Sequence, residues 1–133
     1  GVGHILLIDR QFPQRGPVTT QAVGKMISNR DEVAKALGVV AQRYNLRLVV
    51  QDLVLLPYEE QVRAVAGAAV VVGVHGTSVT SMIHMAVGTE ACCGVVEIFP
   101  SGGEKGRSGN PLLARRLGIV YQRLDVEPLT GAG

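Results

Sequence analysis

Short apolar runs alternate with longer amphipathic segments along this chain. Five runs are rich in Val, Ile and Leu and are bounded by Gly, Pro, Asn or Asp, a pattern that predicts β-strands. These runs are residues 4–9, 46–52, 69–74, 94–99 and 119–124. Between them, apolar residues recur at helical spacing in segments 30–44, 57–66 and 77–86. The order predicts helices that alternate with strands.

Residues that favour helix starts and stops agree with this order. Asn29 with Glu32 forms a capping-box pattern, Pro57 suits a first helical position, and Asn110 followed by Pro111 opens another helix. Gly67 and Gly118 stand where a left-handed residue would end a helix. We therefore expect an α/β fold, a Rossmann-like doubly wound parallel sheet of about five strands, forming a single domain over residues 1–133.

Composition narrows the class of protein. The 133 residues suffice for one core, and 47% of them are hydrophobic with no Trp, as expected for aliphatic layers packed on a sheet. A formal charge of +2 is too small to indicate a nucleic-acid partner, and no apolar run reaches the roughly 20 residues of a membrane span. The start at Gly1 lacks signal-peptide features, so we expect a domain cut from a longer chain.

Three further segments lie outside the regular pattern. The glycine-rich and proline-rich segments 10–24 and 101–109 predict mobile loops that leave strands at the ligand-binding edge, where they would act as lids. Cys92 and Cys93 could pair only as a strained vicinal disulfide, and their position before Val95 favours small buried apolar residues instead.

The sharpest local feature is a buried strand that runs into the turn His75-Gly76-Thr77-Ser78 and then into a predicted helix. The first N–H groups of a helix lack internal partners and carry partial positive charge, so this turn is a candidate anion site. Gly76 would admit a phosphate, Thr77 and Ser78 would supply hydroxyls, and His75 would point at the same oxygens. The alternative is an ordinary helix cap with His75 as a turn residue.

Glu97 is a second candidate because it interrupts the apolar strand 94–99 near its carboxyl end. A buried carboxylate needs partners, and a ribose diol could supply two hydrogen bonds, as at the corresponding edge of dinucleotide-binding folds. The alternative is a glutamate at the sheet edge that pairs with a nearby Arg.

Cationic residues near the first strand form a third group. Arg10, Lys25 and Arg30 are candidates for binding a diphosphate, although for Arg30 a solvated helix start is the favoured interpretation. The sequence lacks the glycine-rich motifs that bind nucleoside triphosphates and dinucleotides. It also lacks a metal-binding Asp-x-Asp motif and the Gly-x-Ser-x-Gly motif of hydrolases. The spacing of His75, His84, Cys92 and Cys93 matches no common zinc site, so no metal is expected.

Taken in order, the motifs resemble glycosyltransferase family 61, over nearly the whole chain. They are the strand end at Arg10, Lys25-x-Ile27-x-Asn29-x-x-Glu32, Leu56-Pro57-Tyr58-Glu59-Glu60-Gln61-Val62, Val72-Gly73-Val74-His75-Gly76 and Val95-Val96-Glu97-Ile98-Phe99-Pro100. That family includes protein O-linked N-acetylglucosaminyltransferases and plant xylosyl- and arabinosyltransferases of the secretory pathway.

The resemblance implies one lobe of a GT-B enzyme, in which two Rossmann-like lobes face a cleft and the second lobe holds a UDP-sugar donor. Transfer would be inverting and independent of metals and cofactors, in the Golgi or endoplasmic reticulum lumen. Arg10, Lys25 and the His75-Gly76-Thr77 turn would hold the diphosphate, Asn29 would lie near the donor, and Glu97 would bind the ribose. The catalytic base would belong to the missing lobe, which would also bind the protein or glycan acceptor, with His75 as a weaker candidate for the base. The lobe alone would be inactive.

The chain departs from the family pattern in ways that keep other functions open. Lys25 stands where Arg is common, and Ser78 and Ser81 replace the glycine and asparagine of the usual His-Gly-Ala-Gly-Leu-Thr-Asn sequence. These losses support an alternative, a non-catalytic or degenerate nucleotide- or phosphate-binding module. A flavodoxin-like phosphate-binding or signalling domain remains a third hypothesis, on the order of elements alone.

Overall fold

Five parallel strands form the sheet of this domain, whose computed structural model describes residues 3–10, 27–76, 78–88, 92–100 and 109–126. The strands lie in the order β2-β1-β3-β4-β5. Their bounds are His4–Ile8 (β1), Arg47–Gln51 (β2), Ala68–Val74 (β3), Gly94–Pro100 (β4) and Val120–Val126 (β5). The predicted Rossmann-like α/β fold is confirmed, as are all five predicted strands.

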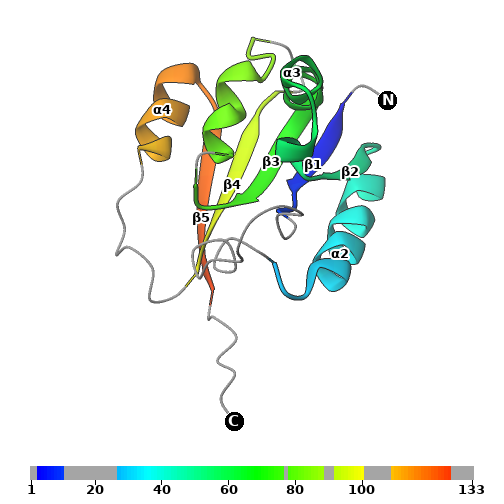
Figure 1. Cartoon of the computed structure of the whole chain (residues 1–133). Coiled ribbons are helices and arrows are strands. Elements are labelled where there is room, and N and C mark those ends of the chain that lie inside the picture. Colours follow the sequence, from blue (N-terminus) through cyan, green and yellow to red (C-terminus); the bar gives the residue numbers. More distant parts are fainter. Residues whose placement is uncertain (1–2, 11–26, 77, 89–91, 101–108, 127–133) are drawn as a thin grey trace.

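Helices cover both faces of the sheet. They are the α-helices α2 (Arg30–Arg43), α3 (Tyr58–Ala66) and α4 (Asn110–Leu117) and the 3-10 helices η1 (Leu53–Leu55) and η2 (Val79–His84). Figure 1 shows α2 on one face and α3, η2 and α4 on the other. A parallel sheet needs cover on both faces because its strands are apolar on both sides.

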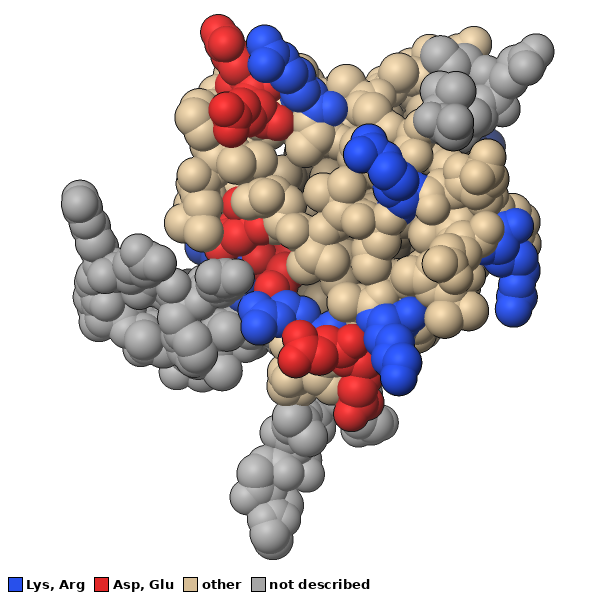
Figure 2. Space-filling view, turned by 90° about the vertical axis from the view of Figure 1, so that its right-hand side faces the viewer, with Lys and Arg blue, Asp and Glu red and all other residues tan. Residues whose placement is uncertain are grey.

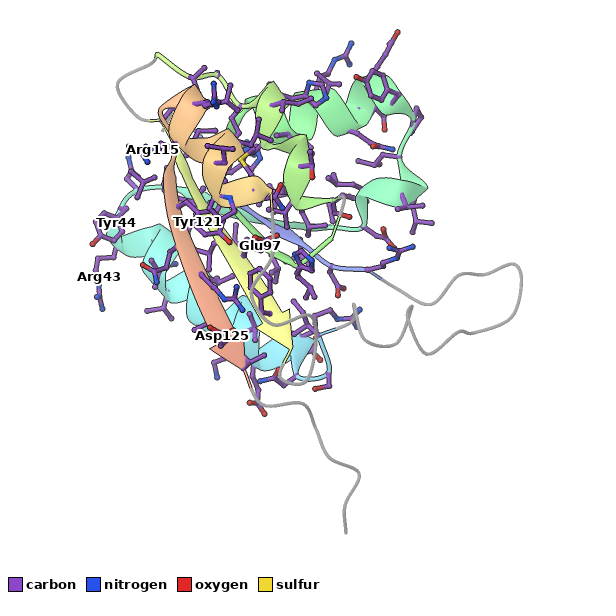
Figure 3. All side chains as sticks on the ribbon, turned by 90° about the vertical axis from the view of Figure 1, so that its left-hand side faces the viewer. Arg43, Tyr44, Glu97, Arg115, Tyr121 and Asp125 are labelled. Atoms are coloured by element: carbon purple, nitrogen blue, oxygen red, sulfur yellow. A yellow bond between two sulfur atoms is a disulfide. The ribbon has the colours of Figure 1, made fainter. Side chains whose placement is uncertain are left out.

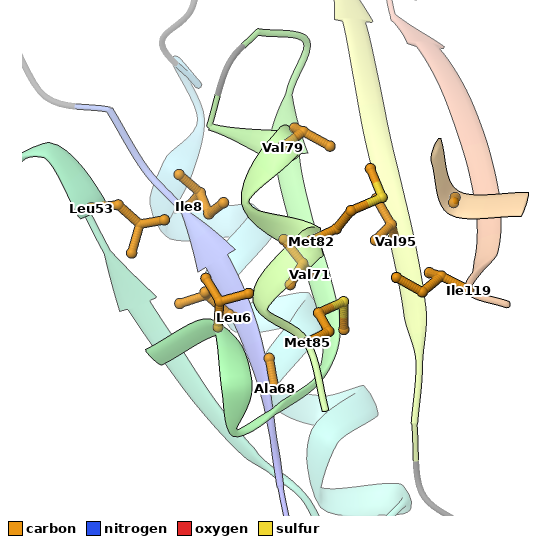
Figure 4. Close-up of a cluster of buried hydrophobic side chains, with 12 residues drawn as sticks. Leu6, Ile8, Leu53, Ala68, Val71, Val79, Met82, Met85, Val95 and Ile119 are labelled. Carbon is orange, nitrogen blue, oxygen red and sulfur yellow. The ribbon is translucent and has the colours of Figure 1, made fainter. Parts of the chain in front are cut away.

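Two hydrophobic clusters fill the space between these layers. Side chains alternate along β1, so Leu6 and Ile8 enter the larger cluster while Ile5 and Leu7 enter the smaller one beneath α2. Figure 4 shows the larger cluster, in which Met82 of η2 lies against β3 and β4. Burying each such side chain stabilises the fold by roughly 1.5–3 kcal/mol.

The adjacent cysteines belong to the edge of the larger cluster. Cys92 and Cys93 are partly buried and pack against it, and their sulfur atoms contact each other. The prediction of buried, unpaired cysteines is therefore wrong, because the two residues form a disulfide and are only partly buried.

The predicted α-helix over residues 77–86 is wrong. Within this segment the structure has a 3-10 helix of six residues, with i to i+3 bonds such as Val79 N–H to Gly76 O at 3.2 Å. Ser81 Oγ donates to Ser78 O at 2.6 Å and so competes with the backbone pattern of an α-helix. A short 3-10 helix has few aligned peptide dipoles, so an anion at this turn would depend on backbone N–H groups, hydroxyl groups and cationic side chains rather than on a helix dipole.

Two of the predicted helix ends also differ. Asn29 precedes α2 but its side chain makes no capping hydrogen bond, so the capping box with Glu32 is absent. Gly67 has φ of −84° rather than a left-handed value. A Cβ on Gly67 would lie 3.1 Å from Cε1 of His4, so this glycine permits a close approach instead. Gly118 is left-handed at φ 75°, as predicted.

The surface between α2, β2 and α3 carries charges of both signs. In Figure 2, which turns that side towards the viewer, basic and acidic side chains of the described residues surround a wide uncharged area.

No helix in the described part of the chain is both long enough and apolar enough to cross a membrane.

Gly73 allows η2 to pack closely on β3. A Cβ on Gly73 would lie 3.1 Å from Cγ2 of Val79 and 3.6 Å from Cβ of Ile8, both of which are buried. We expect Gly73→Ala to lower the free energy of unfolding by about 1–3 kcal/mol because neighbouring core side chains must move. Urea unfolding measures this change. Gly109→Ala is the matched control, since nothing lies within 4 Å of its added Cβ and Gly109 has φ of −75°. Equal stability of the two variants would contradict this account.

Candidate functional site

The carboxyl ends of β1 and β3 meet where the strand order reverses. The chain passes from β1 outward to β2, then returns across β1 to begin β3, so β1 and β3 flank a topological switch point. Ligands of open α/β sheets bind outside the carboxyl ends of strands at such points. Asp9 and Arg10 follow β1, and His75 and Gly76 follow β3. Two of the predicted site segments therefore lie at this edge.

Glu97 is the most deeply buried charged side chain near this edge, with 0% of its surface exposed. It lies opposite Gly73 of β3 and Arg123 of β5 in the sheet register. Side chains alternate along β4, so Glu97 shares its face with Val95 and Phe99, beneath η2 and α4. A carboxylate in this position needs several hydrogen-bond donors to offset the loss of water.

Three side chains from three elements donate to Glu97. Asn110 Nδ2, at the start of α4, lies 2.6 Å from Oε2, and His75 Nδ1, after β3, lies 3.0 Å from the same oxygen. Tyr121 of β5 donates its hydroxyl to Oε1. Figure 3 shows Glu97 and Tyr121 together beside α4. Asn110 Oδ1 also accepts from Thr80 Oγ1 at 3.2 Å, which connects η2 to the same network.

The His75 ring is held on a second side by stacking. It lies nearly parallel to the ring of Phe99, with centroids 4.6 Å apart and planes 20° apart. The Arg123 guanidinium lies 3.6 Å from the centroid of Phe99, and it also pairs with Asp125 at 2.9 Å. Phe99 is therefore fixed by Arg123, and its ring in turn restricts rotation of His75.

Burial gives Tyr121 an unusual titration. Desolvation of the hydroxyl raises the pKa of Tyr121 well above its usual range, and the hydrogen bond to Glu97 and the charge of that carboxylate raise it further. A tyrosinate facing a buried carboxylate would place two like charges together. Tyr121 therefore stays a hydrogen-bond donor throughout the physiological range.

This geometry bears on the role predicted for Glu97. Hydrogen bonds to a ribose would require an accessible carboxylate, but this side chain is wholly buried and accepts from three internal donors. Ribose binding by Glu97 stays a prediction, and it would require this carboxylate to become accessible. Of the suggested pairing with an Arg, the structure shows Arg123 opposite Glu97 in the register. The pKa of the Arg123 guanidinium is raised mainly by its hydrogen bond to Asp125, and the charge of the Glu97 carboxylate adds to this effect. What Glu97 does hold is the ring of His75.

The other predicted residues fall into three groups. Arg10 and Ser78 are half-buried, and Asn29 is exposed. Gly76 has φ of 154°, a conformation that side-chain-bearing residues rarely adopt, so glycine is required in this turn. Lys25 and Thr77 lie outside the described residues, as do residues 11–24 and 101–108 of the two expected loops.

Arg30 forms an ion pair with Asp9. Its Nη1 donates to Oδ2 of the buried Asp9 at 3.0 Å, and this hydrogen bond is the main reason that the pKa of Arg30 is raised. Arg30 therefore joins the start of α2 to the end of β1. Neither prediction for Arg30 included this ion pair.

Sequence reasoning missed four residues of this cluster: Asn110, Tyr121, Phe99 and Arg123. Asn110 was visible only as a helix start. Tyr121 and Arg123 are two positions apart, so their side chains lie on the same face of the sheet. This spacing was the signal in the sequence that could have placed both beside β4. Among the described residues, no group of His, Cys, Asp and Glu is placed to hold a metal ion.

Tyr121 should make stability depend on pH in the alkaline range. Its pKa is raised by folding, so its contribution to stability is present below the ordinary tyrosine pKa of about 10 and is lost as pH rises through the folded pKa. We expect Tyr121→Phe to cost about 1–3 kcal/mol at pH 7, because Glu97 loses a donor, and to flatten the alkaline decline. Urea unfolding between pH 7 and pH 11 tests both effects. Tyr44→Phe, at a residue 68% exposed, is the control; an identical alkaline decline in Tyr121→Phe and the native chain would contradict the assignment.

Comparison with known proteins gives the family. No curated protein matches this chain. The family model described as Glycosyltransferase 61 matches residues 4–92, a stretch that includes β1, β3 and the His75-Gly76 turn. This match spans about two thirds of the 133 residues. The chain belongs to glycosyltransferase family 61.

Proposed function

We propose that this domain is the donor-binding lobe of an inverting, metal-independent GT-B glycosyltransferase that transfers a sugar from a UDP-sugar to a protein or glycan hydroxyl. The observation that carries the proposal is the placement of His75 and Gly76 beside the β1/β3 switch point, within the segment matched by the family model. A glycosyltransferase must bind an anionic donor, and this edge is where such a sheet binds ligands.

The proposed donor site combines backbone, hydroxyl and cationic groups. Gly76 lets the chain approach a diphosphate closely, Ser78 and Thr77 supply hydroxyl groups, and Arg10 and Lys25 supply positive charge. Asn29, exposed before α2, would lie towards the donor. His75 would contact the diphosphate through the ring nitrogen that faces away from Glu97, and Glu97 would position this ring.

The second wall of the cleft and the catalytic base would come from another lobe. An inverting transfer needs a base for the acceptor hydroxyl and stabilisation of the departing UDP. This lobe would stabilise the departing UDP. The transfer would take place in the Golgi or endoplasmic reticulum lumen, the compartments that the family resemblance implies. The lobe would therefore bind donor but transfer no sugar alone.

One observation favours a second candidate function. Ser81 bonds back to Ser78 O, so the turn after His75 is closed by its own side chains where the family pattern has glycine and asparagine. A degenerate, non-catalytic phosphate- or nucleotide-binding module would tolerate these changes. Donor binding distinguishes the two, because a degenerate module would not retain selectivity for UDP.

Calorimetric titration with UDP tests the proposed function. We expect micromolar binding that a metal chelator does not change, with ADP at least tenfold weaker. His75→Ala should weaken UDP binding by about tenfold, or about 1.4 kcal/mol. His84→Ala is the matched control, because Nε2 of His84 lies 3.4 Å from the hydroxyl of Tyr58 instead of at Glu97. Absence of UDP binding by the folded chain, or an equal loss in both variants, would count against the donor site.

A further inference from the structure

The network around Glu97 fixes where the proton of the neutral His75 ring sits. Glu97 Oε2 accepts from Asn110 Nδ2, an atom that can only donate, and Oε1 accepts from Tyr121, which stays protonated. A carboxylate that accepts from such donors is ionised and has no proton of its own to give. His75 Nδ1, 3.0 Å from Oε2, must therefore carry the proton of that hydrogen bond.

The other ring nitrogen is then left without a proton whenever the ring is neutral. Nε2 of such a tautomer is an acceptor. A 180° flip of the ring would place the carbon Cδ2 opposite Glu97 and so lose this hydrogen bond, which holds the ring in its observed orientation. Among the described residues, none forms a hydrogen bond with Nε2, and 29% of the His75 side chain is exposed.

A diphosphate diester offers only acceptor oxygens at neutral pH. An acceptor nitrogen and an acceptor oxygen repel one another, so Nε2 can bind such an oxygen only when the ring holds two protons. On the basis of the proposed donor site, we infer that binding of the donor diphosphate requires His75 to take up one proton. The imidazolium then donates from Nδ1 to Glu97 and from Nε2 to the diphosphate.

The charged groups around the ring are compatible with this protonation. From β4, Glu97 faces Nδ1 directly; from β5, Tyr121 is a neutral donor and Arg123 is paired with Asp125. From α4 and η2, the facing groups Asn110 and Thr80 do not titrate. At the end of β1, the charge of Asp9 is matched by Arg30.

Calorimetry with the β-methyl ester of UDP tests the inference. This probe is a diphosphate diester with no group of its own that titrates near neutrality, so any proton uptake belongs to the protein. Titrations in two buffers of different ionisation enthalpy, from pH 6 to pH 8.5, give the number of protons taken up. We expect this number to rise towards one as pH rises. The affinity should fall as pH rises, by up to tenfold per pH unit, because one proton is taken up for each diester bound.

Two variants separate this mechanism from a general effect of pH. In Glu97→Gln, the amide oxygen can take the place of Oε2 and accept from Asn110 Nδ2 and His75 Nδ1, so the ring keeps its tautomer and binding keeps its proton uptake. The affinity should fall, because the imidazolium loses the negative charge beside it. His75→Gln should remove the uptake. His84→Gln should retain it. Circular dichroism and urea unfolding confirm that each variant is folded.

The outcomes distinguish this inference from the proposed function. Binding by the native chain without proton uptake would overturn the inference and leave the donor site standing, with His75 as an acceptor. Proton uptake that survives His75→Gln would also overturn it, since another group would be titrating. No binding of either UDP or its methyl ester would remove the proposed function and the inference together.

Discussion

A carboxylate buried between a parallel sheet and its helices is costly, and the arrangement of the carboxyl edge of this domain follows from that cost. Glu97 has no exposed surface and is surrounded by donors from β5, α4 and the turn after β3. Truncating any one donor leaves a buried acceptor short of a partner, at about 1–3 kcal/mol. The position of α4 and the orientation of His75 are thus coupled through one side chain.

The coupling extends beyond the segment that identifies the family. The family model matches residues 4–92, whereas Glu97, Asn110, Tyr121 and Arg123 all follow that segment. The turn at His75 is therefore supplied by the matched region, while the groups that orient its ring are supplied by β4, α4 and β5. A chain that kept the turn but lost these partners would retain the motif without the fixed tautomer.

The sequence predicted the fold well and the site only in part, for physical reasons. Strands such as β1 are apolar on both faces, so their runs stand out against the helical spacing of α2 and α3. The 3-10 helix η2 escaped prediction because apolar spacing does not reveal that Ser81 will bond the backbone. Glu97 was visible as a charge within an apolar strand, but its partners are distant in sequence. Register and helix packing bring Tyr121 and Asn110 to it, and neither is encoded locally.

The geometry of His75 also bears on which catalytic task this lobe could perform. In an inverting transfer the acceptor hydroxyl attacks one face of the anomeric carbon while UDP leaves from the opposite face, so base and leaving-group donor stand on opposite sides. His75 has one nitrogen committed to Glu97 and one facing outward, and a single outward nitrogen cannot serve both sides. An imidazolium at the diphosphate stabilises the charge that develops on departing UDP and has no free site to accept a proton from the acceptor hydroxyl. If the ring binds the donor as proposed, the base must be a different group, as a cleft built from two lobes would allow.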